Sequence, residues 1–151
     1  MVALNPQMVF ICAGANDLTA HGNPDDALFN IEQSIKILNA FNSSIPIVIS
    51  TVPPSSNPQA PLKPGAREAV NAGVKKLGEA YQNVVVYDLS ADCMDAEGHQ
   101  NLELFAKDRL HLGPKGYAVW KAGLMPILAK LLTSVEKVPT AKLDLSKFKL
   151  I

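Results

Sequence analysis

The sequence predicts an α/β fold in which a parallel sheet is covered by helices on both faces. Three short apolar runs, at residues 8–12, 45–50 and 84–87, have the length and β-branched content of strands that are buried on both faces. Stretches with a helical spacing of apolar residues separate these runs. Strands that alternate with helices of this length are typical of right-handed crossover units, which join parallel strands.

Each predicted helix has a recognisable start and an apolar stripe. The first covers about residues 25–41, with Asn23 as its N-cap and Pro24 in its first turn. The second covers about residues 64–81, and Gly113-Pro114 opens the third. The residues expected to form the buried stripes are Leu28, Ile31, Ile35 and Leu38 in the first helix, Ala69, Val70, Val74, Leu77 and Tyr81 in the second, and Tyr117, Trp120, Leu124, Ile127, Leu128 and Leu131 in the third.

The chain has 151 residues, which is the length of one domain. We assign residues 1–134 to this domain. Residues 135–151 are polar, contain a proline and follow no clean period, so they are expected to form an appended C-terminal tail. The proline-rich segment 52–61 follows the second strand. Ligands of open α/β sheets bind where strands end, so this segment is expected to shape the rim of a pocket.

Composition excludes several classes of partner. Lysine plus arginine and aspartate plus glutamate number 14 each, which leaves no net field to attract nucleic acid or an anionic membrane surface. No apolar run approaches the roughly 20 residues that span a bilayer, and the first residues lack the features of a signal peptide. Cys12 in the first predicted strand and Cys93 in a predicted loop form no metal or disulfide pattern. This usage indicates a reducing compartment, the cytoplasm.

The segment Gly14-Ala15-Asn16-Asp17 directly follows the first predicted strand. Gly14 permits a tight turn with a close backbone approach, and Asn16 can then project its amide N–H into a cleft. Such a donor can stabilise an oxyanion. The alternative is that Asn16 and Asp17 form a turn and cap a helix, which suits their chemistry equally well.

Asp108 and His111 are three residues apart and directly precede a predicted helix. A turn can bring the carboxylate beside the imidazole, so that Asp108 fixes the tautomer and His111 accepts a proton near neutral pH. The alternative is a capping aspartate beside a solvent-facing histidine. A metal site would combine the same pair with His99 or His21, but no metal-ligand spacing such as HExxH or CxxC is present, and both of these histidines are expected to be exposed.

These two blocks together resemble the SGNH, or GDSL-type, hydrolases. The second block reads Asp108-Arg-Leu-His-Leu-Gly-Pro-Lys-Gly-Tyr-Ala-Val-Trp. The text between the blocks is also similar, including Pro-Ile-Val-Ile-Ser-Thr-Val-Pro-Pro, Val-Val-Val-Tyr-Asp-Leu and Asp95-Ala-Glu-Gly98. The resemblance covers about residues 5–132 and is greatest to the platelet-activating-factor-acetylhydrolase-like branch.

The resemblance implies a flavodoxin-like three-layer α/β/α fold with strand order 2-1-3-4-5. It also implies a serine esterase or lipase-like acylhydrolase that works through an acyl-enzyme on a small-molecule ester, such as an acyl or acetyl ester of a lipid or sugar, without metal or organic cofactor. In this mapping His111 is the general base, Asp108 orients it, and Asn16 with Gly14 forms the oxyanion and substrate site. Asp17 is structural.

The chain departs from this family at the nucleophile. The family opens with a strand that ends in Gly-Asp-Ser, and a second block adds a glycine N–H to the oxyanion hole, but neither is present here. Ser50 and Ser90 also end predicted strands, but neither lies in a Gly-x-Ser-x-Gly elbow. The nucleophile is therefore unknown within this chain, and we expect it in chain that precedes Met1, with about three strands of a truncated sheet remaining.

A strand at residues 8–12 would then be an open edge, available to a second copy in a homodimer or to the missing N-terminal segment. Activity of the isolated chain is expected to be weak. Two other functions stay open at this point. One is a non-catalytic binding or assembly module on the same scaffold. The other is a flavodoxin-like nucleotide or phosphate binder, although no Gly-x-Gly-x-x-Gly or P-loop follows a predicted strand.

Overall fold

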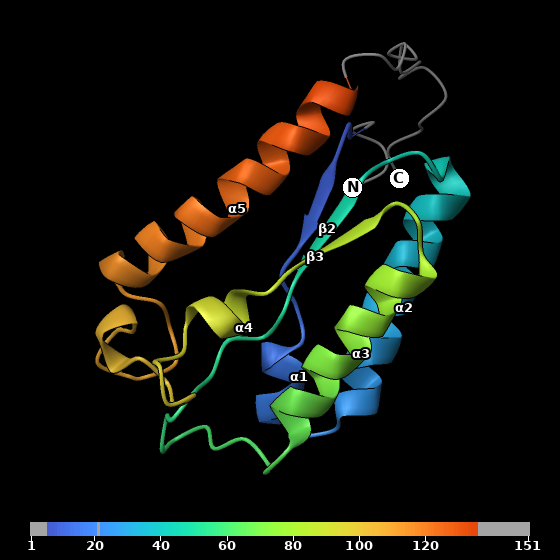
Figure 1. Cartoon of the computed structure of the whole chain (residues 1–151). Coiled ribbons are helices and arrows are strands. Elements are labelled where there is room, and N and C mark those ends of the chain that lie inside the picture. The colour runs from blue at the N-terminus through green and yellow to red at the C-terminus, as the bar shows by residue number, and fades with distance from the viewer. Residues whose placement is uncertain (1–5, 21, 136–151) are drawn as a thin grey trace, which may run out of the picture.

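The computed structural model describes residues 6–20 and 22–135, and its centre is a parallel three-stranded sheet (Figure 1). The strands are β1 (Val9–Ile11), β2 (Ile47–Ser50) and β3 (Val84–Tyr87), in the order β1-β2-β3. Val9 is paired with Ile47, and Ile47 with Val84. The predicted α/β class with three parallel strands is therefore confirmed.

Helices α2 (Pro24–Asn42) and α3 (Ala66–Ala80) cover one face of the sheet. The side chain of Asn23 accepts a hydrogen bond from the Asp25 N–H at 3.1 Å, so the predicted N-cap is confirmed. The stripes of both helices are the core of this layer, except that Ala69 is exposed. The buried hydrophobic residues of this layer are Ala27, Ile31, Ile35 and Leu38 in α2 and Ala66, Val70 and Val74 in α3.

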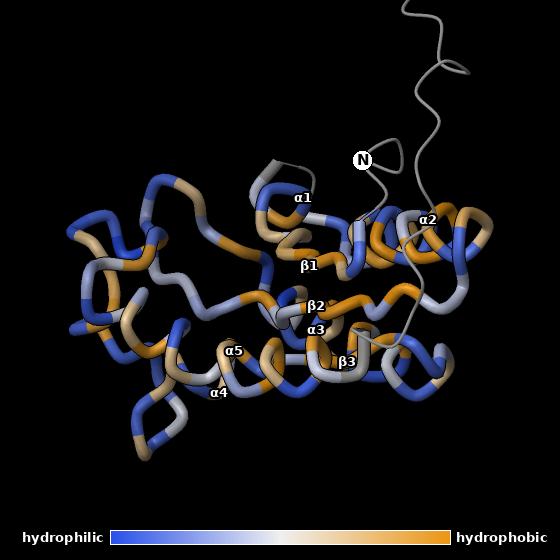
Figure 2. The backbone as a smooth tube through the Cα atoms, turned by 90° about the horizontal axis from the view of Figure 1, so that it is seen from above, coloured by the Kyte–Doolittle hydropathy of each residue, from blue (hydrophilic) through white to orange (hydrophobic). Residues whose placement is uncertain are grey.

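Helices α4 (Leu89–Asp92) and α5 (Pro114–Val135) cover the opposite face. Trp120 packs there against Phe10 of β1, with ring centroids 5.9 Å apart. Tyr117, which was expected in the buried stripe, is 56% exposed and stacks on the outer side of Trp120. Hydrophobic residues concentrate in the strands between the two helical layers (Figure 2).

Three short elements are absent from the sequence prediction because each is too brief to show a helical period. They are α1 (Ala15–Ala20), α4 and the 3₁₀ turn Leu102–Leu104. The two cysteines also differ from expectation. Cys12 lies just beyond β1 and is exposed, whereas Cys93 follows α4 and is buried, and burial raises the pKa of its thiol to about 11.

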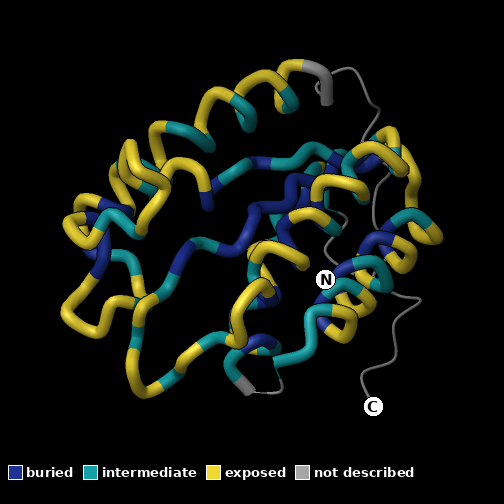
Figure 3. Tube along the Cα trace, turned by 60° about the horizontal axis from the view of Figure 1, so that its bottom comes forward, coloured by how far each residue is buried: buried dark blue, intermediate teal, exposed yellow. Residues whose placement is uncertain are grey.

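The first strand is less buried than its neighbour. All four residues of β2 are buried, whereas in β1 only Val9 is (Figure 3). Within the described ranges no strand pairs with the outer edge of β1. A groove of about 410 Å³ runs between this strand and α2, where the side chain of Ile37 is 62% exposed. The expectation that this strand is buried on both faces therefore fails at its open edge.

The assignment of residues 1–134 to a domain and 135–151 to a tail stays a prediction. Helix α5 extends to Val135, and residues 136–151 lie outside the described part of the chain. None of the helices in residues 6–20 and 22–135 has the length and apolar character needed to cross a membrane.

Candidate active site

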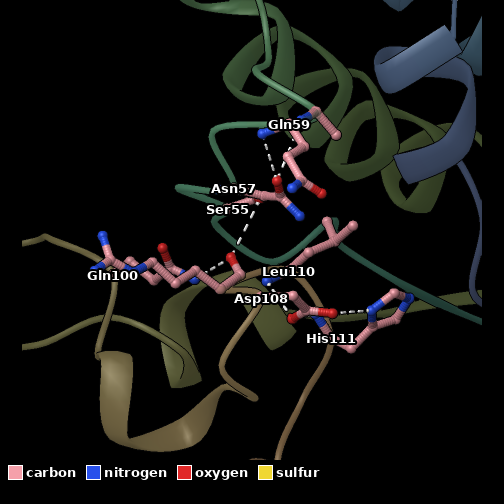
Figure 4. A network of polar contacts seen from close by, with 9 residues as sticks. Ser55, Asn57, Gln59, Gln100, Asp108, Leu110 and His111 are labelled. Atoms are coloured by element: carbon pink, nitrogen blue, oxygen red, sulfur yellow. Dashed lines mark hydrogen bonds and ion pairs between the residues drawn. The ribbon is translucent and has the colours of Figure 1, made fainter.

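Asp108 closes the turn that precedes α5 and holds His111 at the same time. Its Oδ1 atom accepts hydrogen bonds from the backbone N–H groups of Leu110 and His111, both at 3.0 Å. Its Oδ2 atom lies 2.6 Å from Nδ1 of His111 (Figure 4). The two alternatives for Asp108 are thus compatible, because one carboxylate oxygen caps the turn and the other contacts the imidazole.

The contacts of Asp108 favour its ionised form. The hydrogen bond with His111, followed by the backbone N–H groups of Leu110 and His111, lowers the pKa of this carboxyl to about 2. An ionised carboxylate at Nδ1 keeps the proton on that nitrogen. Nε2 of a neutral ring is then left as a proton acceptor. The His111 side chain is 74% exposed, so this nitrogen is accessible.

Asn16 lies in the first turn of α1, at the carboxyl end of β1. Gly14 precedes it with φ of +100°, a backbone conformation that is strained for a residue with a Cβ and therefore favours glycine. The Asn16 amide is exposed and forms no hydrogen bond with another described residue. Asp17 instead accepts one from Asn30 at 3.3 Å, which fits a structural part. A pocket of about 260 Å³ is lined by residues 12–17 and 51–53.

The segment after β2 contacts both the pocket of Asn16 and the turn of Asp108 and His111. Val52 lines the pocket of Asn16, and its backbone N–H and C=O bond the amide of Asn71 at 2.7 and 2.9 Å. A few residues further on, the Ser55 hydroxyl and the Ser56 N–H reach the carbonyl oxygen of Arg109, each at 3.3 Å. Asp108 and His111 are therefore in direct contact with each other. Asn16 lies at the carboxyl end of β1 and forms no hydrogen bond with either residue.

Asn71 is the positioning residue that sequence reasoning missed. It is 8% exposed and lies on the buried side of α3 between Val70 and Val74. A polar residue beside an apolar stripe is a usable signal, since a buried amide needs partners. Its partner, the backbone of Val52, has no sequence signature.

Neither candidate serine is placed as a nucleophile. Ser50 is 1% exposed, and its hydroxyl has no hydrogen-bond partner in the described structure. Ser90 is 4% exposed, and its hydroxyl accepts a hydrogen bond from Arg67 at 2.7 Å. A nucleophile must reach the substrate and a base, and both serines are almost fully buried.

The described residues contain no group of three or more histidine, cysteine, aspartate or glutamate side chains that could hold a metal ion. The side chain of His99 is 79% exposed and lies 3.9 Å from Asp95. His21 falls outside the described residues.

The low pKa of Asp108 predicts a contribution to acid unfolding. An aspartate in an unfolded chain titrates near 3.9, above the folded value of about 2. The contribution is therefore present above about pH 4 and is lost as the pH falls through about 2. We expect Asp108→Asn to flatten this part of the stability curve, measured by urea unfolding at a series of acidic pH values. Asp26→Asn is the control, because Asp26 is exposed and is not in this turn. Equal acid slopes for Asp108→Asn and the parent chain would contradict the prediction.

Several solved structures resemble this chain. A GDSL-like lipase from Bacteroides thetaiotaomicron superposes with a TM-score of 0.72 at 22% identity over 86% of this chain and 65% of its own. An acetyl esterase mutant with an acetate ion gives 0.70 at 22% identity, over 87% and 61%. A carbohydrate esterase family 3 protein from Talaromyces cellulolyticus gives 0.68 at 23% identity, over 89% and 61%. At these identities the likeness establishes the shared fold, and the chain spans less than two thirds of each structure.

A search of curated proteins found no match. A family model matches most of the chain, from residue 1 to residue 119, and its description is the GDSL-like Lipase/Acylhydrolase family. The matched range includes β1 with Asn16 as well as the turn of Asp108 and His111. This chain therefore belongs to the GDSL-like lipase/acylhydrolase family.

Proposed function

We propose that this chain supplies the base, the orienting acid and one oxyanion donor of an enzyme that hydrolyses carboxylic esters through an acyl-enzyme. The observation that carries the proposal is the 2.6 Å contact between Asp108 and His111. The segment after β2 contacts the turn of this pair and also lines the pocket of Asn16. Family membership supports the class of reaction. The names of two similar structures, an acetyl esterase and a carbohydrate esterase, favour acetyl esters as the first substrates to test.

In the proposed reaction, Nε2 of His111 takes the proton of a serine hydroxyl while the serine oxygen bonds to the ester carbonyl carbon. The carbonyl oxygen becomes an oxyanion and accepts a hydrogen bond from the Asn16 amide. The His111 proton then passes to the leaving alcohol as the ester bond breaks. Water repeats the sequence on the acyl-enzyme, which releases the acid. Asp108 stays ionised throughout and stabilises the imidazolium.

We further propose that the serine belongs to polypeptide outside these 151 residues. The burial of Ser50 and Ser90 supports this, as does the absence of Gly-Asp-Ser from the sequence. An enzyme that lacks one member of the triad keeps a rate roughly 10³- to 10⁴-fold above that in water. We therefore expect the purified chain to hydrolyse p-nitrophenyl acetate weakly but measurably above buffer and above heat-unfolded protein.

This assay separates the proposal from the alternatives. A rate equal to that of heat-unfolded protein would favour a non-catalytic binding or assembly module. Turnover at the rate of an ordinary esterase, at a typical kcat of about 10 s⁻¹, would mean that the chain contains a nucleophile after all.

We also propose that the open edge of β1 pairs with another polypeptide, either a second copy or a segment that precedes β1 in the family. Within the described residues no strand pairs with the outer edge of β1, and this edge together with the apolar groove beside Ile37 supports the proposal. A dimer in sedimentation with protection of the β1 amides would favour the second copy. A monomer whose β1 amides are already protected from hydrogen exchange would contradict both.

For the compartment, we propose the cytoplasm. The Cys12 thiol is free and exposed, and an oxidising compartment would leave it open to oxidation or intermolecular pairing. This reading is tested by localising a tagged full-length protein.

A further inference from the structure

One residue in the turn of Asp108 and His111 has an unusual backbone. Arg109 has φ of +56° and is the only residue other than glycine with a positive φ in the described ranges. Such a conformation is unfavourable for a residue with a Cβ and persists only where the surroundings hold it. Contacts from its surroundings must therefore hold Arg109 in this conformation.

Three donors converge on the carbonyl oxygen of Arg109. Nε2 of Gln100 donates at 2.9 Å and the hydroxyl of Ser55 at 3.3 Å, and both side chains are drawn in Figure 4. The backbone N–H of Ser56 also donates, at 3.3 Å. These donors come from two separate segments. Ser55 and Ser56 lie in the loop after β2, and Gln100 forms an isolated β-bridge with Met94 before the 3₁₀ turn. The carbonyl is thus fixed from outside its own turn.

The Arg109 carbonyl belongs to the same planar peptide unit as the Leu110 N–H. That N–H donates to Oδ1 of Asp108 at 3.0 Å, and Oδ2 of the same carboxylate contacts His111 at 2.6 Å. An unbroken series of contacts therefore runs from Gln100, through one peptide plane, to the imidazole. Rotation of this plane would withdraw a hydrogen bond from Asp108.

The amide N–H of the Gln100 side chain is the group of this amide that has a hydrogen-bond partner. Its Oε1 atom is buried without a hydrogen-bond partner in the described structure, which is a cost, whereas its Nε2 makes the shortest contact to Arg109. Its backbone is fixed by pairing with Met94. The Ser55 hydroxyl is also fixed, because it accepts a hydrogen bond from the Asn57 N–H at 3.3 Å.

We propose that Gln100, assisted by Ser55, is a positioning residue for Asp108 and His111, because it fixes the peptide plane that anchors the carboxylate. The catalytic importance of this positioning rests on the proposed function. Its structural content, the orientation of one carboxylate, stands on the contacts alone.

Gln100→Met tests this directly, because methionine keeps the length of glutamine and removes the donor. We follow the Asp108 carboxyl carbon and the His111 Nδ1 proton by NMR. In the parent chain the carboxyl is expected to titrate near 2, with a downfield Nδ1 proton from the short contact. In Gln100→Met the midpoint is expected to rise toward the ordinary aspartate value of about 3.9, and the Nδ1 signal to broaden or disappear.

Three further variants complete the design. Gln100→Lys retains a donor and is expected to restore part of the parent titration. Ser55→Ala removes a longer contact and is expected to shift the midpoint less, which keeps the test open if Gln100→Met does not fold. Gln59→Met is the control, because the Gln59 side chain is exposed and lies in the loop after β2, away from Asp108 and His111. Parent-like titration of Asp108 in a folded Gln100→Met chain would overturn the proposal, and this readout does not depend on ester hydrolysis.

Discussion

Replacement of Asn71 with alanine is expected to lower the free energy of unfolding by about 2–4 kcal/mol. Asn71 is 8% exposed, and its amide satisfies both the N–H and the C=O of Val52. Alanine would leave both backbone groups buried without partners, and each such group costs about 1–3 kcal/mol. Urea unfolding followed by circular dichroism measures the change.

The consequence should extend to the pocket, since Val52 lines the site of Asn16. Glu79→Ala is a suitable control, because Glu79 is exposed on the same helix and its loss should change stability by no more than about 0.5 kcal/mol. If Asn71→Ala unfolded at the same urea concentration as Glu79→Ala, the assigned part of Asn71 in holding the segment after β2 would be wrong.

Asn16→Ala is expected to lower the residual rate of p-nitrophenyl acetate hydrolysis about 100- to 1000-fold. In an enzyme that lacks a triad member, the residual rate comes from the oxyanion hole and from substrate binding, so loss of this amide should remove most of it. The fold should persist, because Asn16 lies in α1, its amide makes no hydrogen bond in the described structure, and alanine is the better helix former. Initial rates at matched protein concentration give the comparison.

Asn42→Ala is the matched control for this substitution. Asn42 is an exposed asparagine at the last residue of α2, next to the end of the sheet where β2 begins. Its variant should hydrolyse the ester at the parent rate. Equal rates for Asn16→Ala and Asn42→Ala would exclude Asn16 as the oxyanion donor.

Periodicity and capping residues were sufficient for the main elements of the fold. The three apolar runs became parallel strands, and Asn23 is the N-cap of α2 as predicted, although the helix begins at Pro24 and not at about residue 25. The exposure of Tyr117 was not predictable in this way, because a helical stripe specifies which side of α5 faces inward but not how far the sheet extends beneath it. Trp120 contacts Phe10 of β1, whereas Tyr117 stacks on Trp120 and stays exposed.

The pairing of Asp108 with His111 was predictable because a spacing of three in a turn brings the two side chains together. The network that orients this pair was not. Gln100, Ser55 and Asn71 act on the carbonyl and amide groups of Arg109 and Val52, and any residue type offers those backbone groups. Only the folded backbone reveals which of them need a partner.

In the enzyme that we propose, this chain holds the base and the oxyanion donor, and the nucleophile lies in other polypeptide. The most direct measurement is intact-protein mass spectrometry after treatment of the folded chain with an excess of an activated fluorophosphonate, which bonds covalently to activated serines. We expect the mass to stay that of the unmodified chain. One stoichiometric adduct on a serine, lost in His111→Ala, would contradict it and identify the nucleophile.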